Sequence, residues 1–170
     1  FLGYNDLEAE CQIITIVSEG KNVNKIKNDQ EAVIILNQTP FYGESGGQVG
    51  DQGYFENDNF KFEVTNTTKI FGNYFLHTGK VIIGSCELND TIKATVNSKN
   101  RDLIKYNHSS THLLHAALRK ILGKHVTQKG SLVNSEKLRF DFSHNNPIQN
   151  EQLSSIEDIV NYQIQKDGNF

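Results

Sequence analysis

The stretch Thr91-Ile-Lys-Ala-Thr-Val-Asn-Ser98 separates two kinds of hydrophobic pattern in the sequence. Before it, short runs are β-branched or alternate between apolar and polar residues, which is typical of strands. After it, apolar residues recur every three or four positions, as on one face of a helix. Asn97 or Ser98 can cap that helix. The pattern predicts an α+β chain, with an antiparallel barrel or sandwich over residues 1–97 and a helix–hairpin–helix unit over residues 98–170.

The same patterns predict the element boundaries. Five strands separated by Gly, Asn and Asp are expected over residues 10–17, 31–36, 60–64, 74–83 and 91–96. The first helix should end at Leu122 before Gly123, two strands should cover residues 125–133 and 137–142, and a second helix should open at Asn150. The residues expected on the buried helix faces are Leu103, Ser110, Leu114, Ala117 and Ile121, and then Leu153, Ile156, Val160 and Ile164.

The composition excludes several classes of protein. With 170 residues, 36% of them hydrophobic, and a net charge of −3, the chain is neither a disordered polyelectrolyte nor a histone-like protein. No run approaches 18 apolar residues, so no membrane partner is expected. Cys11 and Cys86 form no CxxC, which favours a reducing, cytoplasmic setting over a disulfide framework. The chain starts at Phe1 and contains no methionine, so we expect a piece of a longer protein.

Positive charge is concentrated in residues 98–140, which we call the basic zone. It contains nine lysines and arginines against two acidic residues, a net charge of +7 in a chain of net charge −3. Such a zone on an acidic protein fits a polyanion partner such as RNA. The alternative is a solvated helix face followed by hairpin lysines.

The first predicted helix carries His108 and His112, four residues apart. Residues at this spacing share a helix face, so both imidazoles can reach one metal ion such as Zn²⁺. Thr111 projects to the same side, and His115 and Arg119 continue the stripe, which indicates a polar cleft. The alternatives are half-buried helix histidines, a Thr111 hydroxyl bonded to a helix carbonyl, and a His115 with a buried hydrogen bond.

Two loop or strand segments add candidate binding groups. The segment Gly43-Glu-Ser-Gly-Gly-Gln-Val-Gly-Asp51 is neither a P-loop nor GxGxxG, but its glycines allow close backbone approach. It could present amides to a phosphate or to the acceptor end of an RNA, or it could be a tight barrel corner. The segment Val126-Thr-Gln-Lys-Gly-Ser-Leu-Val133 places Gln128 in a predicted strand, where its amide could orient a small polar substrate or a water.

Taken together, these segments resemble the editing domain of alanyl-tRNA synthetase, nearly from end to end. The resemblance is strongest in the stretches 39–53, 107–119, 122–133 and 138–144. Similar domains occur in free-standing trans-editing proteins and in threonyl-tRNA synthetase. The fold that the resemblance implies is a small antiparallel β-barrel, with its Gly-rich loop at 43–51, followed by an α/β two-layer sandwich.

The resemblance implies hydrolysis of mischarged Ser-tRNA(Ala) and Gly-tRNA(Ala). The parent enzyme would be an alanine–tRNA ligase, with ATP and Mg²⁺ bound only in an aminoacylation domain outside this chain. The partners implied are the tRNA(Ala) acceptor end and the rest of the parent synthetase. A second, hydrolytic site is needed because glycine fits any alanine pocket, and one added hydroxyl is rejected only about 100-fold by binding.

The resemblance also assigns residues. Its zinc motif is HxxxH followed by CxxxH; His108 and His112 match the first half, and Thr111 and Gln128 match pocket positions and are the candidate catalytic residues. The Gly-rich loop and the basic zone, rather than the resemblance, supply the candidate substrate- and tRNA-binding residues, which are Gly46, Gly47, Gln48, Lys105, Arg119, Lys124 and Lys129. No CxxxH occurs up to Phe170, so we expect one zinc ion in the intact domain but weak zinc binding and weak hydrolysis by this chain.

Two other functions remain open at this point. The chain could be a non-catalytic module that binds tRNA and positions its acceptor stem. It could also be a free-standing aminoacyl-tRNA deacylase, although the missing start methionine and CxxxH argue against that alternative.

Overall fold

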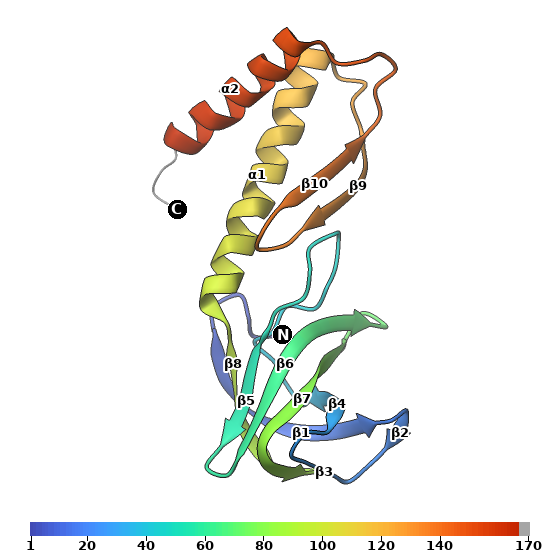
Figure 1. The fold of residues 1–170 in the computed structure, drawn as a ribbon, viewed down its shortest axis with the longest axis vertical. Coiled ribbons are helices and arrows are strands. Elements are labelled where there is room, and N and C mark those ends of the chain that lie inside the picture. The colour runs from blue at the N-terminus through green and yellow to red at the C-terminus, as the bar shows by residue number, and fades with distance from the viewer. Residues whose placement is uncertain (167–170) are drawn as a thin grey trace. The chain divides into compact units, whose positions relative to one another are not determined.

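The computed structural model describes residues 1–166 and divides the chain into two compact units (Figure 1). Unit 1 comprises residues 1–45 and 49–101, and unit 2 comprises residues 46–48 together with the chain from residue 102 onward. No helix in the described part of the chain is long and apolar enough to cross a bilayer.

Unit 1 is a closed antiparallel barrel of six strands. The strands are β1 (Glu8–Ser18), β4 (Glu31–Leu36), β7 (Tyr74–Glu87), β6 (Phe60–Ile70), β5 (Gly53–Asn57) and β8 (Thr91–Val96), in that spatial order. The barrel closes because β1 pairs with β4 along one part of its length and with β8 along another. Two short strands, β2 (Lys21–Asn22) and β3 (Lys25–Lys27), add to β1 and β7.

The barrel interior is filled by the inward-facing residues of these strands. Alternation is clearest in β4 and β8, where every second side chain is buried. Phe41, Phe55 and Phe62 are the largest fully buried side chains of this core. Cys11 and Cys86 are also buried there and are free thiols, as the sequence predicted.

The predicted strands are confirmed, but one barrel strand was missed. β5 begins at Gly53, directly after the Gly-rich loop, so a loop was the natural interpretation of its sequence. Gly53 is required there because a Cβ at this position would collide with the carbonyl oxygen of Thr95 on β8. The glycine therefore belongs to a close strand pairing and not to a flexible turn.

Unit 2 is built from helices and a two-stranded hairpin. Its elements are α1 (Ser98–Leu122), whose residues up to Arg101 belong to unit 1, then β9 (Gln128–Val133), β10 (Leu138–Phe142) and α2 (Asn150–Lys166). Figure 1 shows the hairpin running alongside α1. A second core joins the three parts, with Ala117, Leu118, Val126 and Ile156 buried at its centre.

The predicted helix faces were only partly right. Leu103 is half exposed, whereas its neighbour Ile104 is buried, so the buried stripe of α1 runs one residue later than predicted at its N-terminal end. In α2, Ile156 is buried as predicted, but Leu153 and Ile164 are 44% and 38% exposed. Apolar spacing alone cannot choose between adjacent apolar residues such as Leu103 and Ile104.

Candidate functional site

A small cavity of about 140 Å³ lies within unit 2, and we call it the histidine cavity. Its walls come from α1, from the two hairpin strands and from the tip of the Gly-rich loop. The lining residues are Gly46, His108, Thr111, His112, His115, Gln128, Ser131, Val133 and Phe140. The structure therefore places five of the candidate residues, His108, Thr111, His112, Gln128 and Gly46, along one cavity.

The two histidines of the HxxxH motif face each other on successive turns of α1. Their Nε2 atoms are 3.1 Å apart, and the ring centroids are 4.9 Å apart. Burial lowers the pKa of His108 below its usual value, and the nearby charge of His112 lowers this pKa further. Both effects favour the neutral imidazole, which is the form that ligates a metal ion.

This pair fits one half of a zinc site. With Zn–N bonds of about 2.0–2.1 Å, two nitrogen ligands of a tetrahedral ion lie roughly 3.3 Å apart, close to the spacing observed. Within residues 1–166, however, no three His, Cys, Asp or Glu side chains are grouped so as to hold a metal ion. His108 and His112 can therefore supply two donors, and the described chain supplies no third.

Thr111 is almost fully buried, and its hydroxyl makes one hydrogen bond within the helix. Its Oγ1 donates to the carbonyl oxygen of Asn107 at 2.8 Å, which is the helix back-bond considered as the alternative above. The hydroxyl proton is thereby used within α1. Thr111 can still accept a hydrogen bond or contact a ligand through its methyl group, but it has no second proton to donate.

Gln128 and Ser131 connect the hairpin to the Gly-rich loop. Gln128 Nε2 donates to Ser131 Oγ at 3.1 Å, and Ser131 Oγ donates to the Gly46 carbonyl at 3.3 Å. With one amide hydrogen used in this way, Oε1 is the atom that Gln128 can offer to a donor on a ligand. Ser131 was quoted within a motif but given no role in the sequence interpretation, and it proves to be the link between these groups.

The loop tip approaches β9 closely. Val133 N donates to the Gly47 carbonyl at 2.8 Å, and Gln48 forms an isolated parallel bridge with Val133. Gly47 has a φ of 86°, and a Cβ there would collide with Ser131. Glycine is thus needed at this position for both backbone conformation and space. Gly47 and Gln48 bring the loop to the cavity rim but are not among the residues lining it.

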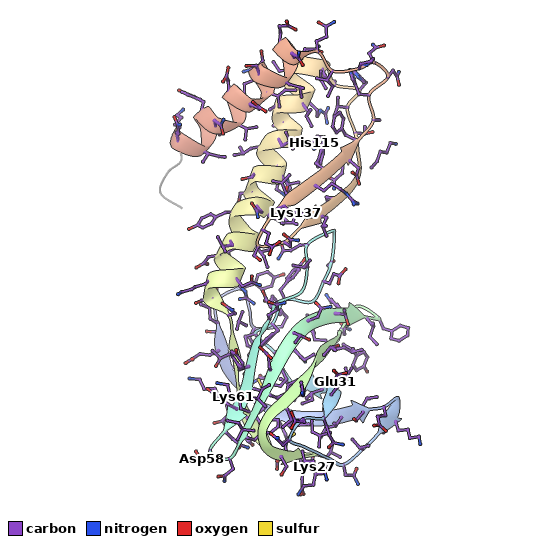
Figure 2. The ribbon with its side chains drawn as sticks, in the orientation of Figure 1. Lys27, Glu31, Asp58, Lys61, His115 and Lys137 are labelled. Carbon is purple, nitrogen blue, oxygen red and sulfur yellow. The ribbon has the colours of Figure 1, made fainter. Side chains whose placement is uncertain are left out.

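The surroundings of His115 differ from those considered for it in the sequence analysis. Its Nε2 is buried but has no hydrogen-bond partner among the described residues, so this atom does not make the buried hydrogen bond considered as an alternative. The imidazole packs against Phe140 of β10, with ring centroids 5.1 Å apart. Figure 2 shows His115 on the side of α1 that faces the hairpin. One residue that lines the cavity therefore has a buried nitrogen without a hydrogen-bond partner among the described residues.

The four basic candidates do not reach the cavity. Lys105 and Arg119 lie on exposed positions of α1, Lys124 follows the helix, and Lys129 is exposed on β9. None of them lines the histidine cavity. Any contact they make with a polyanion would therefore be made outside the cavity, on the surface of unit 2.

A second hollow in unit 2 was not predicted. His125 and His144 both line it and contact each other, with Nε2 of the former 2.9 Å from Nδ1 of the latter. The hollow has a volume of about 460 Å³, and side-chain amides from the loop before α2 and from its first turn also line it. Both histidines lie in the motif stretches quoted above, but their spacing of 19 residues gave no sign of this pairing.

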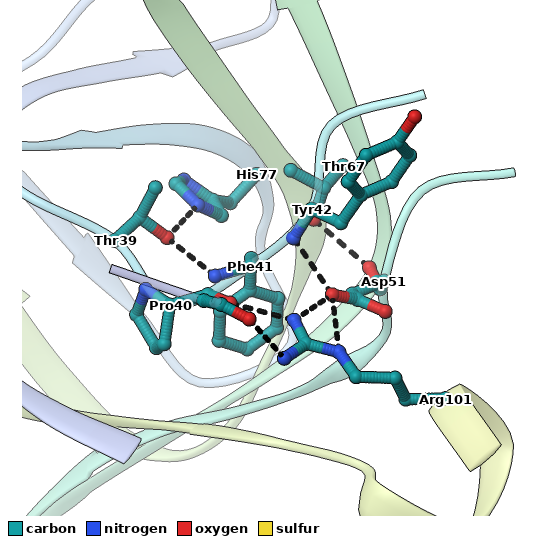
Figure 3. A network of polar contacts seen from close by, with 9 residues as sticks. Thr39, Pro40, Phe41, Tyr42, Asp51, Thr67, His77 and Arg101 are labelled. Carbon is teal, nitrogen blue, oxygen red and sulfur yellow. Dashed lines mark hydrogen bonds and ion pairs between the residues drawn. The ribbon is translucent and has the colours of Figure 1, made fainter. Parts of the chain in front are cut away.

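The ends of the Gly-rich loop are fixed in unit 1 by a buried network (Figure 3). Tyr42 N donates to Asp51 Oδ2 at 2.7 Å, and Asp51 N donates to the Tyr42 carbonyl at 2.9 Å. Arg101, at the start of α1, donates to Asp51 Oδ2 through Nε and Nη2, and to the Pro40 carbonyl through Nη2. Thr67 Oγ1 donates to the Asp51 carbonyl at 2.9 Å. The network holds residues 42 and 51 together at the base of the loop.

The chain can be compared with known proteins on this basis. Residues 1–100, which include the barrel strands and the Gly-rich loop, match a family model described as tRNA synthetases class II (A). The match covers more than half of the chain and places it among the aminoacyl-tRNA synthetases, a lineage of ligases. The chain belongs to the class II tRNA synthetase family (A). The match ends before the histidine cavity, whose residues on α1 and the hairpin lie beyond it.

Proposed function

We propose that this chain is the editing module of alanyl-tRNA synthetase, which hydrolyses Ser-tRNA(Ala) and Gly-tRNA(Ala). Membership of the synthetase family supports a role with aminoacyl-tRNA, and the histidine cavity supports hydrolysis of a small aminoacyl ester. The observation that carries the proposal is the set of residues around this cavity. It combines an HxxxH pair with a side-chain amide and a threonine, in a space sized for a very small amino acid.

The size of the cavity supports a small aminoacyl group as the substrate. A buried cavity of about 150 Å³ holds one benzene molecule, which has six heavy atoms. A seryl group also has six heavy atoms, an alanyl group five and a glycyl group four. At about 140 Å³, the histidine cavity has room for each of these groups. The substrates proposed are therefore esters of the smallest amino acids.

The residues would divide the work as follows. His108 and His112 would hold part of a zinc coordination shell, and the bound ion would supply Lewis-acid polarisation of the ester or of its attacking water. Gln128, fixed by Ser131, would orient the ester or the water through Oε1. Thr111 would limit the size of the aminoacyl side chain with its methyl group. The loop amides near Gly47 would lie close to the terminal nucleotide of the tRNA.

The basic zone supports binding of the tRNA itself. Lysines outside the cavity can neutralise phosphates, so affinity should fall with added salt. Charge reversal at Lys105, Lys124 and Lys129 should weaken tRNA binding and flatten this salt dependence. The same zone would also serve a non-catalytic module that only positions the acceptor stem, so tRNA binding alone does not separate the two functions.

Measuring the hydrolysis of three aminoacylated tRNAs distinguishes the editing module from the non-catalytic module. With the chain in excess and zinc supplied, the ester half-lives of Ser-tRNA(Ala) and Gly-tRNA(Ala) should shorten, though only by a small factor because the described residues supply just two metal donors, whereas that of Ala-tRNA(Ala) should not change. His108→Ala should remove the acceleration because it removes a metal ligand, and triple charge reversal in the basic zone should reduce it through weaker binding. A chain that binds tRNA with unchanged half-lives for all three esters would be the non-catalytic module instead.

A further inference from the structure

The hairpin of unit 2 contains a β-bulge that decides which face of β9 carries Gln128. Consecutive residues of β10 pair with Gly130 and with Gln128, so the residue between these two, Lys129, is extra in β9. In a regular strand, residues three apart point to opposite faces of the sheet. One extra residue reverses this, so the bulge brings Gln128 to the face of Ser131, where the two side chains are hydrogen-bonded. Both residues line the histidine cavity.

The Gly46 carbonyl sets the direction of the hydrogen bonds at this face. A carbonyl oxygen only accepts, so the Ser131 hydroxyl uses its one hydrogen on it, at 3.3 Å. Ser131 Oγ can then only accept, and it accepts from Gln128 Nε2 at 3.1 Å. An amide turned end for end would place Oε1 against a hydroxyl that has no hydrogen left to donate. The contact with Ser131 therefore disfavours the flipped amide of Gln128.

The tip of the Gly-rich loop holds this carbonyl against the hairpin. The neighbouring Gly47 carbonyl accepts from Val133 N at 2.8 Å, which ties the tip to the end of β9. A Cβ on Gly47 would collide with Ser131, so the loop and this serine are in direct contact at a position that only glycine can occupy. The loop tip thus controls the hydroxyl of Ser131, and this hydroxyl controls the amide of Gln128.

Building on the proposed function, we propose that Ser131 is a positioning residue that fixes the Gln128 amide so that Oε1 accepts from the amino group of an aminoacyl ester. The ester carbonyl carries no hydrogen to donate, whereas the amino group is a donor that all aminoacyl esters share. Ser131 has no hydrogen of its own left for the substrate, because the Gly46 carbonyl takes it. Ser131 therefore acts on the substrate through Gln128.

The side-chain amide resonances of Gln128 test the contact in the free chain. In ¹H–¹⁵N spectra, this pair of signals is identified by its absence in Gln128→Leu. Ser131→Ala should move the pair to the chemical shifts and fast hydrogen exchange of an exposed amide, whereas Ser131→Thr, which keeps a hydroxyl, should preserve most of the wild-type pattern. Ser143→Ala removes a hydroxyl beside the hairpin and outside the cavity, and should leave the pair unchanged. Unchanged Gln128 signals in Ser131→Ala would overturn the proposal.

Binding of a stable analogue tests the role in recognition without any catalytic turnover. The probe is an adenosine that carries a seryl group through a 3′-amide, which replaces the ester. Ser131→Ala should weaken its binding roughly twofold to tenfold, the usual effect of one hydrogen bond, and Ser131→Thr should restore part of it. In the Gln128→Ala background, Ser131→Ala should have no further effect, because the two residues act through one contact. A 3-hydroxypropanoyl probe, which lacks the amino group, should bind the wild-type chain and Ser131→Ala equally.

The possible results point to different conclusions. Equal weakening by Ser131→Ala in the wild-type and Gln128→Ala backgrounds, or of both probes, would show a general structural role and overturn the proposal while the proposed function stands. A wild-type chain that does not bind the seryl probe would instead contradict the proposed function, and with it the role of Oε1, even if the Gln128 signals change as predicted. Far-UV circular dichroism checks the folding of each variant. Ser131→Cys, with a weakly hydrogen-bonding thiol of similar size, replaces the alanine variant if that variant does not fold.

Discussion

Replacing Asp51 with asparagine is expected to destabilise unit 1 by about 3–5 kcal/mol, the usual cost of removing one partner of a buried ion pair. The Asp51 and Arg101 side chains are only 2% and 6% exposed. Asparagine has nearly the same shape but no charge, so it would leave the Arg101 guanidinium buried without a counter-ion. Since domains are stable by only about 5–15 kcal/mol, this single change would remove a large part of the stability of the barrel.

A matched surface pair provides the control for this prediction. Lys25 and Glu87 form an ion pair of 2.7 Å, but more than half of each side chain is exposed. Glu87→Gln should therefore hardly change stability, because water screens exposed pairs. Urea unfolding followed by circular dichroism gives the stabilities, and hydrogen exchange of barrel amides assigns the loss to unit 1. Equal effects of Asp51→Asn and Glu87→Gln would contradict the role given to the buried pair.

The second large effect concerns His77, which should make the barrel sensitive to acid. Burial lowers the pKa of His77 to about 4 from an ordinary value of 6.5. Nδ1 donates to the Ile34 carbonyl at 2.9 Å. Nε2 therefore carries the lone pair that accepts from Thr39 Oγ1 at 2.9 Å (Figure 3). Thr39 Oγ1 in turn accepts from Phe41 N at 3.1 Å. The neutral His77 ring on β7 is thus hydrogen-bonded to Thr39, in the segment that precedes the Gly-rich loop.

The sign of the pH effect follows from proton binding. Between pH 6.5 and pH 4 the unfolded chain binds a proton at His77 that the folded barrel does not, so stability falls as the pH is lowered. The gap between the two pKa values corresponds to about 3 kcal/mol, present in full above pH 7 and lost by about pH 4. Urea unfolding at several pH values measures this slope. His77→Asn should flatten it, and an identical slope in this variant would show that other groups carry the acid sensitivity.

The fold was largely predictable from the sequence because its signals are local. Period-2 alternation gave the strands, and Gly123, with a φ of 119°, ends α1 as predicted. β5 was missed because its first residue looks like the end of a glycine loop, whereas it is a site of close strand contact. The buried stripe of α1 was shifted because Leu103 and Ile104 are equally apolar, and only the packing decides between them.

The candidate site was predictable only where residues share an element. His108, Thr111 and His112 lie on one helix face, and their joint position at the cavity followed from spacing. The pairing of Asp51 with Arg101 spans 50 residues and has no sequence signature. Ser131 and Phe140 are opposite each other in the hairpin register, which alternation within either strand cannot show. The unsatisfied nitrogen of His115 depends on what surrounds it and was not predictable.

The most direct test of the central claim is to map where a small aminoacyl ester analogue binds. The ¹⁵N-labelled wild-type chain would be titrated with the seryl 3′-amide of adenosine while its backbone amide resonances are followed. We predict saturable shifts concentrated at Gly46 and Gly47, along residues 108–115 of α1 and along residues 128–133 of the hairpin. An absence of shifts, or shifts confined to the hollow lined by His125 and His144, would contradict the assignment of the histidine cavity as the site of aminoacyl-ester binding.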